Sequence, residues 1–419
     1  MFDMSDMSIS TLVAVDVPAM SELLARYQPG DCLLVSPSGT RLGQGVVCAL
    51  APNPSEAGAT RESAARYLKT QVRAMLHEAV QHGVHGPVVM GAVPFDIRRT
   101  ARLVVPRQCH FGACAQPDAA LAVGGTTVAQ SMAPYPASSV YEAAVIQALE
   151  CFERAEIDKV VLARTLDVTL AEVPDRRVLL SRMVQRNLNG YTYAIALQNP
   201  SEAAAEGLAQ PAAFVGATPE LLVRREGQRI IVNPLAGSAA RRADSHSDAV
   251  AGQQLLASVK DRHEHAVVID AVVQALQPLC RTLNVPDAPT LLTTDALWHL
   301  STTLTGELSD PETTSLDLAL ALHPTPAVCG YPVEPAFDVL QKLEPFDRGL
   351  FAGFVGWCDA SGDGEWAVSL RCAQLRDRSL RLFAGAGIVA GSNPHSESQE
   401  TGTKFRTMLS ALGLSTSMD

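Results

Sequence analysis

Two carboxylates and an amine lie close together near the end of the chain, in the stretch ESQETGTKF. Glu397, Glu400 and Lys404 follow one another at intervals of three and four residues, so a helix would place them on one face. Paired carboxylates beside the glycine-rich stretch AGAGIVAG suit a hard cation that holds an anionic ligand. The same spacing also describes a solvated helix with a Glu400–Lys404 ion pair.

The glycines of GAGIVAG resemble the dinucleotide-binding fingerprint GxGxxG. That fingerprint must open a βαβ unit and be followed by an acidic residue about 20 positions later. The residues that follow GAGIVAG leave no room for the remaining strands of such a unit. We therefore expect these glycines to let backbone amides approach a carboxylate instead.

Lys159 begins an otherwise apolar segment, DKVVLART. Strand alternation places Lys159 on one face with Val161 and Ala163. Such a lysine either extends to solvent at the edge of a sheet or is desolvated for base chemistry.

Glu264 lies between two histidines in DRHEH, which invites a metal-site interpretation. On a helix His263 and His265 point to nearly opposite sides, so both cannot bind one ion, and the metalloprotease pattern HExxH is absent. Glu264 alone remains a candidate oxygen ligand or a solvated charge.

Arg371 occurs in AVSLRCAQL, where the neighbours on its strand face are Ala367, Ser369 and Ala373. These small residues leave room for a planar carboxylate, which the guanidinium binds through two hydrogen bonds. The alternative is an ordinary surface arginine.

Composition restricts the function classes. The net charge of −11 argues against nucleic acid as a partner. Nine cysteines without a CxxC pair indicate reduced, buried thiols. No uncharged apolar run approaches the roughly 20 residues of a membrane span, and the first residues lack a basic signal region, so we expect a cytoplasmic protein without a membrane partner.

The element pattern predicts an α+β fold, a single large domain with an antiparallel or mixed β-sheet core flanked by helices. Before about residue 136 we expect a hairpin over 32–50, a helix over 63–83, a strand over 88–96 and a linker or surface excursion over 115–138. Beyond it we expect helices over 139–157, 175–187 and 251–280, strands over 159–170 and 192–199, strands broken by turns over 212–238, and a three-stranded meander over 350–389.

Ten motifs give the chain a family resemblance. KVVLAR, GATPELL, PLAGS, KDRHEH, LWHLSTTLTGEL, HPTPAVCG, FAGFVGW, SLRCA, AGAGIVAGSNP and ESQETGTK occur in the order seen in chorismate-utilising enzymes. That family includes isochorismate and salicylate synthases, anthranilate synthase and aminodeoxychorismate synthase. The resemblance implies a catalytic region over 136–415, with 1–135 as the N-terminal part of the same fold.

Two positions distinguish the chemistries within this family. Anthranilate-type enzymes carry glutamine where Lys159 stands, and aminodeoxychorismate synthases carry a lysine nucleophile where Ala236 stands. A water-activating Lys159 and an inert Ala236 imply that water attacks the ring. The DRHEH and PLAGS forms look most like siderophore-pathway isochorismate synthases, which convert chorismate to isochorismate in a Mg²⁺-dependent isomerisation.

The resemblance also implies the roles of the site residues. Lys159 would remove a proton from the water that attacks C2, and Glu220 would protonate the departing C4 hydroxyl. These roles require a deprotonated amine and a protonated carboxyl. The implied metal ligands are Glu264 and Glu400, with Glu397 beside them. The implied substrate-binding residues are Gly237, Ser238, His299, Arg371, Gly385 and Lys404.

Other functions stay open at this stage. A salicylate synthase would use the same first step and then eliminate pyruvate. A catalytically inactive chorismate-binding protein and an amidotransferase-dependent aminating enzyme are further alternatives. The resemblance implies chorismate as the small-molecule substrate, no amidotransferase subunit and a monomer.

Overall fold

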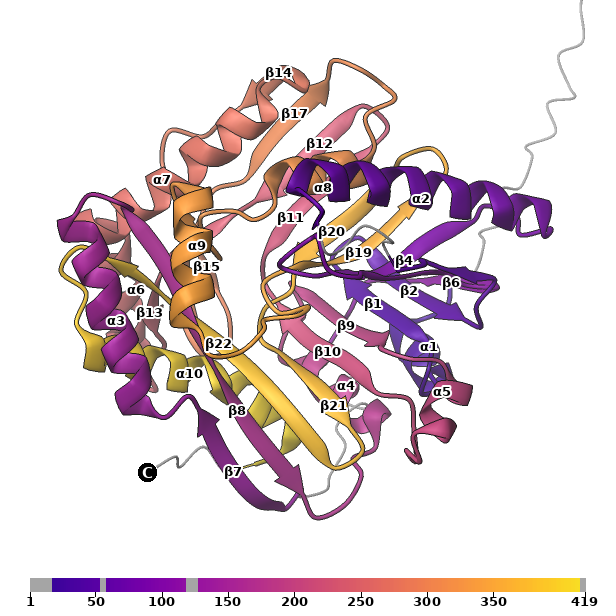
Figure 1. Ribbon diagram of the computed structural model, residues 1–419, viewed down its shortest axis with the longest axis horizontal. Coiled ribbons are helices and arrows are strands. Elements are labelled where there is room, and N and C mark those ends of the chain that lie inside the picture. Colours follow the sequence, from indigo (N-terminus) through magenta and orange to yellow (C-terminus); the bar gives the residue numbers. More distant parts are fainter. Residues whose placement is uncertain (1–16, 53–57, 118–126, 415–419) are drawn as a thin grey trace, which may run out of the picture.

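The computed structural model describes residues 17–52, 58–117 and 127–414. Its largest sheet has ten strands, and all the strand pairs described in it are antiparallel. The order is β18-β8-β22-β21-β10-β9-β1-β2-β6, with β7 on β8 (Figure 1). The bounds are β1 Cys32–Ser36, β2 Gly39–Gln44, β6 Gln108–Gly112, β7 Ala129–Tyr135, β8 Lys159–Leu170, β9 Tyr191–Ala196, β10 Ala213–Thr218, β18 Gly330–Tyr331, β21 Cys372–Arg376 and β22 Ser379–Val389.

A second sheet of nine strands has the order β14-β17-β12-β11-β20-β19-β4-β5-β3, and a third contains β13-β16-β15. The nine are β3 Cys48–Ala49, β4 Val88–Val93, β5 Arg102–Val105, β11 Leu221–Glu226, β12 Arg229–Asn233, β14 Cys280–Asn284, β17 Leu304–Leu308, β19 Phe354–Asp359 and β20 Gly364–Val368. The three are β13 Leu235–Ala240, β15 Thr290–Thr293 and β16 Leu297–Ser301. These sheets and the flanking helices confirm the predicted α+β class.

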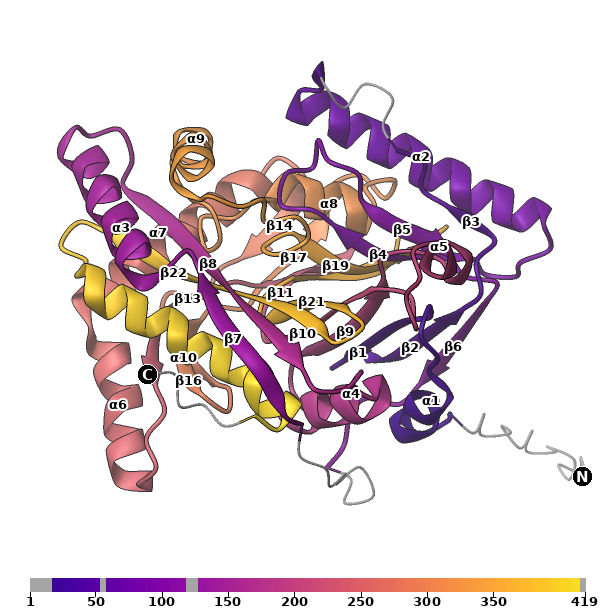
Figure 2. The same cartoon turned by 60° about the horizontal axis from the view of Figure 1, so that its bottom comes forward.

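The helices cover the outer faces of the sheets. Their bounds are α1 Met20–Arg26, α2 Arg61–Gln81, α3 Ser138–Glu153, α4 Arg176–Gln185, α5 Pro200–Ala205, α6 Ser245–Ala257, α7 Val259–Leu276, α8 Ser315–Leu322, α9 Val333–Leu343 and α10 Pro394–Leu412. Figure 2 shows α1, α4 and α10 along one side of the ten-stranded sheet. Their apolar side chains form one buried cluster with that sheet, so this side has its own core.

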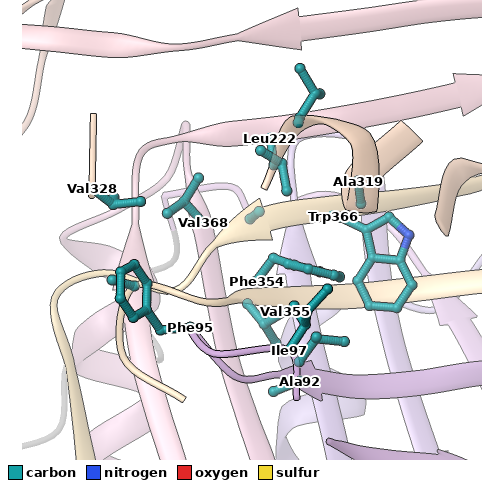
Figure 3. Close-up of a cluster of buried hydrophobic side chains, with 14 of the residues drawn as sticks. Ala92, Phe95, Ile97, Leu222, Ala319, Val328, Phe354, Val355, Trp366 and Val368 are labelled. Atoms are coloured by element: carbon teal, nitrogen blue, oxygen red, sulfur yellow. The ribbon is translucent and has the colours of Figure 1, made fainter. Parts of the chain in front are cut away.

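The larger core joins the two big sheets with α2, α3, α8 and α9. Figure 3 shows part of it around Phe354 and Trp366, whose rings meet edge to face with centroids 5.4 Å apart. Phe95 stacks on Phe337 at 5.4 Å in the same cluster. Because the two large sheets share this core, neither can be removed without exposing the apolar face of the other.

Strands from both parts of the chain pair with each other in the two large sheets. β1 pairs with β9, and β4 pairs with β19. The boundary between 1–135 and 136–415 stays a prediction, but the described sheets run across it. The predicted hairpin over 32–50 is confirmed by β1 and β2, which turn between Ser36 and Gly39.

The structure corrects the linker predicted over 115–138. Residues 129–135 form strand β7, which pairs with β8 from Ala129 opposite Leu170 to Tyr135 opposite Thr165. Its side chains are mostly exposed, so the sequence lacks the alternation of a half-buried strand. Residues 118–126 lie outside the described part of the chain.

The three-stranded meander predicted over 350–389 is also wrong. Four strands occupy this stretch, with β19 and β20 in the nine-stranded sheet and β21 and β22 in the ten-stranded sheet. The chain crosses between the sheets at 369–371, where Arg371 has a φ of +45°. Left-handed backbone is unusual for a residue with a side chain, so the crossing holds Arg371 in a strained conformation.

β22 pairs with β8 in antiparallel orientation from Ser379 opposite Thr169 to Val389 opposite Lys159. The first two glycines of GAGIVAG, Gly385 and Gly387, therefore lie in an antiparallel strand, and the segment does not open a βαβ unit, as predicted. Gly385 and Gly387 stand opposite Ala163 and Val161, next to the first residue of β8.

The single helix predicted over 251–280 is wrong, because α6 ends before Ser258 and α7 begins after it. Ser258 has an extended conformation, and its hydroxyl oxygen accepts a hydrogen bond from the Asp261 amide at 3.3 Å. This is N-cap geometry, which satisfies an amide that otherwise has no partner. The apolar periodicity of the sequence continues across Ser258, so the pattern alone did not predict that one helix ends and another begins there.

Replacing Ser258 with Ala is expected to lower the free energy of unfolding by about 1 kcal/mol, because the N-cap bond is lost. Urea denaturation monitored by circular dichroism measures this difference. Ser139→Ala, at an exposed position in α3, is the matched control and is expected to change stability little. Equal stability of the two variants would contradict the capping role.

Candidate functional site

One cavity gathers all of the candidate site residues. Its empty space is about 1040 Å³, counted out to its open mouth. Strands β8, β13, β16 and β22, helices α7 and α10, and the segments after β10 and β20 contribute to its wall. The candidate residues that line it are Lys159, Glu220, Gly237, Ser238, Glu264, His299, Arg371, Gly385, Glu397, Glu400 and Lys404.

Lys159 does not extend to solvent. Its side chain is 3% exposed, and its Nζ lies 2.8 Å from Glu264 Oε1 of α7. Burial alone raises the pKa of Glu264, but the charge and the hydrogen bond of Lys159, together with the charges of Lys404 and Lys260, outweigh it, so this pKa is lowered overall. Gly387 leaves space for the pair, because a Cβ there would lie 2.8 Å from Glu264 Oε1 and 3.4 Å from Lys159 Cε.

Glu220 lies in the connection between β10 and β11 and is 3% exposed. Its Oε1 accepts a hydrogen bond from the Leu235 amide at 3.5 Å. Desolvation raises the pKa of this carboxyl to about 7, against the opposing effects of that hydrogen bond and of the charges of Lys159 and Arg371. A large fraction of Glu220 is therefore protonated near neutral pH, as a proton donor requires.

Arg371 and His299 form a buried pair on the wall. Arg371 Nη2 donates to His299 Nε2 at 2.6 Å, because a guanidinium has only donors. Burial lowers the pKa of His299 far below its usual value, and the charge of Arg371 lowers it further. The imidazole is therefore neutral with its proton on Nδ1. Burial also lowers the pKa of Arg371, to about 10, so it remains a cation.

The face of α10 predicted from the sequence does point into the cavity. Lys404 Nζ lies 2.8 Å from Glu400 Oε1 and donates to the Gly385 carbonyl at 2.8 Å. Ser238 Oγ donates to Glu400 Oε1 at 3.5 Å. Burial raises the pKa of Glu397, and the negative charge of Glu400 raises it further. The two carboxylates are close enough to repel each other.

The PLAGS segment reaches the cavity through a bulge in β13 between Leu235 and Ser238. Gly237 has a φ of +78°, and a Cβ there would lie 3.1 Å from the Asp261 Cβ. Glycine therefore suits this position for two reasons: it adopts the left-handed backbone conformation readily, and it has no Cβ to crowd Asp261. The histidines of DRHEH separate as expected. His263 is exposed, whereas His265 is buried and bonds the Ala236 carbonyl and the Thr302 hydroxyl.

Several cavity residues were missed by the sequence reasoning. Lys260 and Asp261 line the cavity beside Glu264, and their place in the KDRHEH motif was a usable signal. An apolar part of the wall comes from Val161, Val328, Phe351 and Phe383. These side chains look like ordinary core residues in the sequence, and only their position beside the cavity separates them from the core.

The carboxylates suit a magnesium ion. The described residues contain no group of three or more His, Cys, Asp or Glu side chains arranged to hold a metal. Mg²⁺ however needs few carboxylates and keeps several waters. The repulsion between Glu397 and Glu400 is relieved by a nearby cation. The donor chemistry of Glu264, Glu397 and Glu400 therefore fits Mg²⁺.

Two further features concern the whole chain. Among the described residues, no helix combines the length and apolar character needed to cross a bilayer. All nine cysteines lie in the described part and are free thiols. Six are buried as predicted, whereas Cys48 and Cys114 are half-buried and Cys109 is exposed.

The carboxyl of Glu220 is expected to titrate with a midpoint near pH 7, because burial raises its pKa to about 7. Infrared difference spectra between the wild type and Glu220→Gln isolate this carboxyl. Its protonated C=O band should fade as the pH rises through 7. Spectra of Glu226→Gln, which alters a carboxyl exposed at the end of β11, provide the control. A midpoint near the ordinary value of 4.5 would contradict the burial argument.

Comparison with known proteins assigns the family. A family model described as chorismate binding enzyme matches residues 117–413. The chain is 45% identical to isochorismate synthase DhbC of Bacillus subtilis over 392 residues, which are 94% of this chain and 96% of that protein. It is 41% identical to isochorismate synthase EntC of Escherichia coli K12 over 349 residues, 82% of this chain and 86% of that protein.

A solved structure agrees with these sequence matches. The crystal structure of DhbC from Bacillus anthracis, named as a 2,3-dihydroxybenzoate-specific isochorismate synthase, superposes with a TM-score of 0.86 at 42% identity. The superposition covers 94% of this chain and 100% of that chain. This chain belongs to the chorismate binding enzyme family.

Proposed function

We propose that this protein is an isochorismate synthase, which converts chorismate to isochorismate. Water adds at C2 of the ring and the C4 hydroxyl leaves, so the net reaction is an isomerisation. One observation carries the proposal: a buried amine, Lys159, and a buried carboxyl with a raised pKa, Glu220, line the same cavity. An amine and a protonated carboxyl provide the base and the acid that the two bond changes require.

Lys159 is the proposed general base. In the deprotonated form that this role requires, its amine removes a proton from the water that attacks C2, so the ammonium that pairs with Glu264 must first release its own proton. The location at the first residue of β8 fixes its backbone, since Lys159 pairs with Val389 of β22 and Tyr331 of β18. Its pairing with Glu264 fixes the direction of the side chain.

Glu220 is the proposed general acid. Its carboxyl gives a proton to the C4 hydroxyl, which departs as water instead of hydroxide. After one turnover the proton lost by the attacking water resides on Lys159 and the proton of Glu220 has left. A proton transfer through solvent restores both groups, so protons balance over the cycle.

The carboxylates of the substrate are assigned to separate parts of the wall. Arg371 and Gly385 hold the pyruvyl carboxylate, and Gly237 and Ser238 meet the ring carboxylate. His299 contacts the ring as a neutral group, and its bond to Arg371 orients the guanidinium. Lys404 contributes positive charge beside Glu400. These cations reverse locally the negative field of a chain with a net charge of −11.

Mg²⁺ is the proposed cofactor, held by Glu264 and Glu400 with Glu397 beside them. When bound, it neutralises the ring carboxylate and withdraws negative charge from the ring. Glu264 and Glu400 are paired with Lys159 and Lys404 in this structure, so their carboxylates are already oriented toward the cavity.

We also propose a pathway, a compartment and an oligomeric state for the enzyme. Similarity to DhbC and EntC supports a role in siderophore biosynthesis through 2,3-dihydroxybenzoate or salicylate. Free thiols at all nine cysteines support a reducing compartment, the cytoplasm. Lys159, which activates water, supports an enzyme that works without an amidotransferase subunit. The monomeric state implied by the family resemblance is part of the same proposal.

The product formed from chorismate and Mg²⁺ tests the function. Purified protein is expected to form isochorismate, identified by chromatography, without any partner enzyme. Salicylate fluorescence in the same reaction would reassign the protein as a salicylate synthase. Absence of turnover would leave only chorismate binding and would refute the proposal.

Replacing Lys159 with Gln is expected to lower kcat at least about 10²-fold while chorismate still binds, because the base is lost and the shape of the side chain is largely kept. Steady-state kinetics and isothermal titration calorimetry separate the two effects. Asp158→Asn, at the exposed neighbouring residue, is the control and should keep wild-type activity. Retained turnover in the Lys159→Gln variant would refute the base assignment.

Replacing Glu220 with Gln is expected to lower kcat at least about 10²-fold and to leave Mg²⁺ binding intact. In the wild type, kcat/KM should fall as the pH rises through about 7, because the acid loses its proton there. Rate profiles against pH and metal titrations measure these effects. A Glu220→Gln variant that binds no metal would show that the carboxyl is a ligand instead of the acid.

A further inference from the structure

Arg164 of β8 is a buried cation outside the cavity, with only 4% of its surface exposed. By strand alternation it points to the face of β8 opposite Lys159. The described hydrogen-bond partners of its guanidinium are all neutral, two in α10 and one in α3. Burying a guanidinium among neutral groups costs free energy, so its N–H groups must form hydrogen bonds of good geometry.

Two of these hydrogen bonds tie β8 to α10. Arg164 Nε donates to Thr401 Oγ1 at 2.6 Å, and Nη2 donates to the Ser398 carbonyl at 2.9 Å. The Thr401 hydroxyl in turn donates to the same Ser398 carbonyl at 2.7 Å, which leaves its lone pairs free to accept from Arg164. The guanidinium also lies 5.9 Å from the centroid of the Phe405 ring.

The contacts of Arg164 in α10 are each one residue away from a cavity residue. Ser398 follows Glu397, Thr401 follows Glu400 and Phe405 follows Lys404. One residue corresponds to about 100° of rotation around a helix. Fixing the face that contains Ser398 and Thr401 therefore also fixes the adjacent face that lines the cavity.

We propose that Arg164 is a positioning residue that sets the rotation and the axial position of α10, and so aims Glu397, Glu400 and Lys404 at the cavity. This inference rests on the proposed function for its catalytic consequence. Apolar packing alone tolerates small shifts of a helix, whereas hydrogen bonds are directional. A guanidinium is suited to this task because its planar fork reaches Thr401 and Ser398 together, which a single ammonium does not match.

Figure 2 shows α10 and α3 beside each other against β8 and β22. A single side chain of β8 can therefore contact both helices. The third bond of the guanidinium, from Nη1 to Ser138 Oγ at 2.9 Å, reaches the first residue of α3. It holds the same cation but does not touch α10. Ser138 therefore offers a comparison with Thr401. Both hydroxyls accept a hydrogen bond from Arg164, but only the bond to Thr401 holds α10.

The test compares three single substitutions. Thr401→Val keeps the volume and the branching but removes the acceptor for Nε. Thr401→Ser keeps the hydroxyl, and Ser138→Ala removes the bond to α3. We expect Thr401→Val to raise the chorismate KM and the half-saturating Mg²⁺ concentration at least tenfold, with kcat changed less. Thr401→Ser and Ser138→Ala should stay within about twofold of the wild type.

Melting temperatures and hydrogen exchange of the α10 amides accompany the kinetics. Thr401→Val also removes the bond of its buried hydroxyl to the Ser398 carbonyl, so it should lower the melting temperature more than Ser138→Ala, which changes an exposed residue. Only Thr401→Val should speed exchange in 394–412. Equal KM values and equal exchange in these two variants would overturn the inference. A wild type that makes no isochorismate would refute the proposed function instead, and the exchange data would still decide the role of Arg164.

Discussion

A buried ammonium must have a partner, and the contact of Lys159 with Glu264 at 2.8 Å meets this requirement next to the cavity. The pair joins the first residue of β8 to α7, and it fits only because β22 presents Gly387 at that point. Eleven residues of β22 run against β8 and fix the position of that glycine. The arrangement of β8, α7 and β22 therefore depends on the Lys159–Glu264 pair. This pair occupies the space that a side chain at position 387 would fill.

Around this pair, the cavity separates charges by role. Arg371 stays a cation although it is buried, and burial together with the charge of Arg371 keeps His299 neutral. In the described part of the chain no cation forms an ion pair with Glu220, and desolvation outweighs the charges of Lys159 and Arg371 in setting its pKa. Glu397 and Glu400 lie on one helix, where their repulsion favours a cation. A site with these groups can bind an anion, hold a metal and exchange protons without large rearrangement.

The structure also shows how distant segments support these groups. The crossing between sheets at 369–371 sets the strained backbone of Arg371. A bulge and a left-handed glycine bring Gly237 and Ser238 to the wall. Arg164 connects β8 to α10 from the other face of the strand. Backbone geometry and a residue outside the cavity thus determine where the cavity residues point.

Local patterns in the sequence predicted much of this correctly. The strand over 159–170 has the predicted bounds, and the spacing of Glu397, Glu400 and Lys404 places all three on the cavity side of α10. These features depend on the period of a strand or helix, which the order of residues determines directly. The ordered motifs indicated the family, because each motif is a short run of residues that can be recognised in the sequence without knowledge of the fold.

What the sequence could not decide involves contacts between distant segments. Periodicity did not reveal the break at Ser258, the division of 350–389 between two sheets or the pairing of the exposed strand β7. Whether Lys159 is solvated or buried, and whether Glu220 is charged, depends on burial by segments far away in the chain. The sequence thus determined which residues share a face, and the tertiary structure decided which faces meet, because desolvation and ion pairing arise only where separate elements pack together.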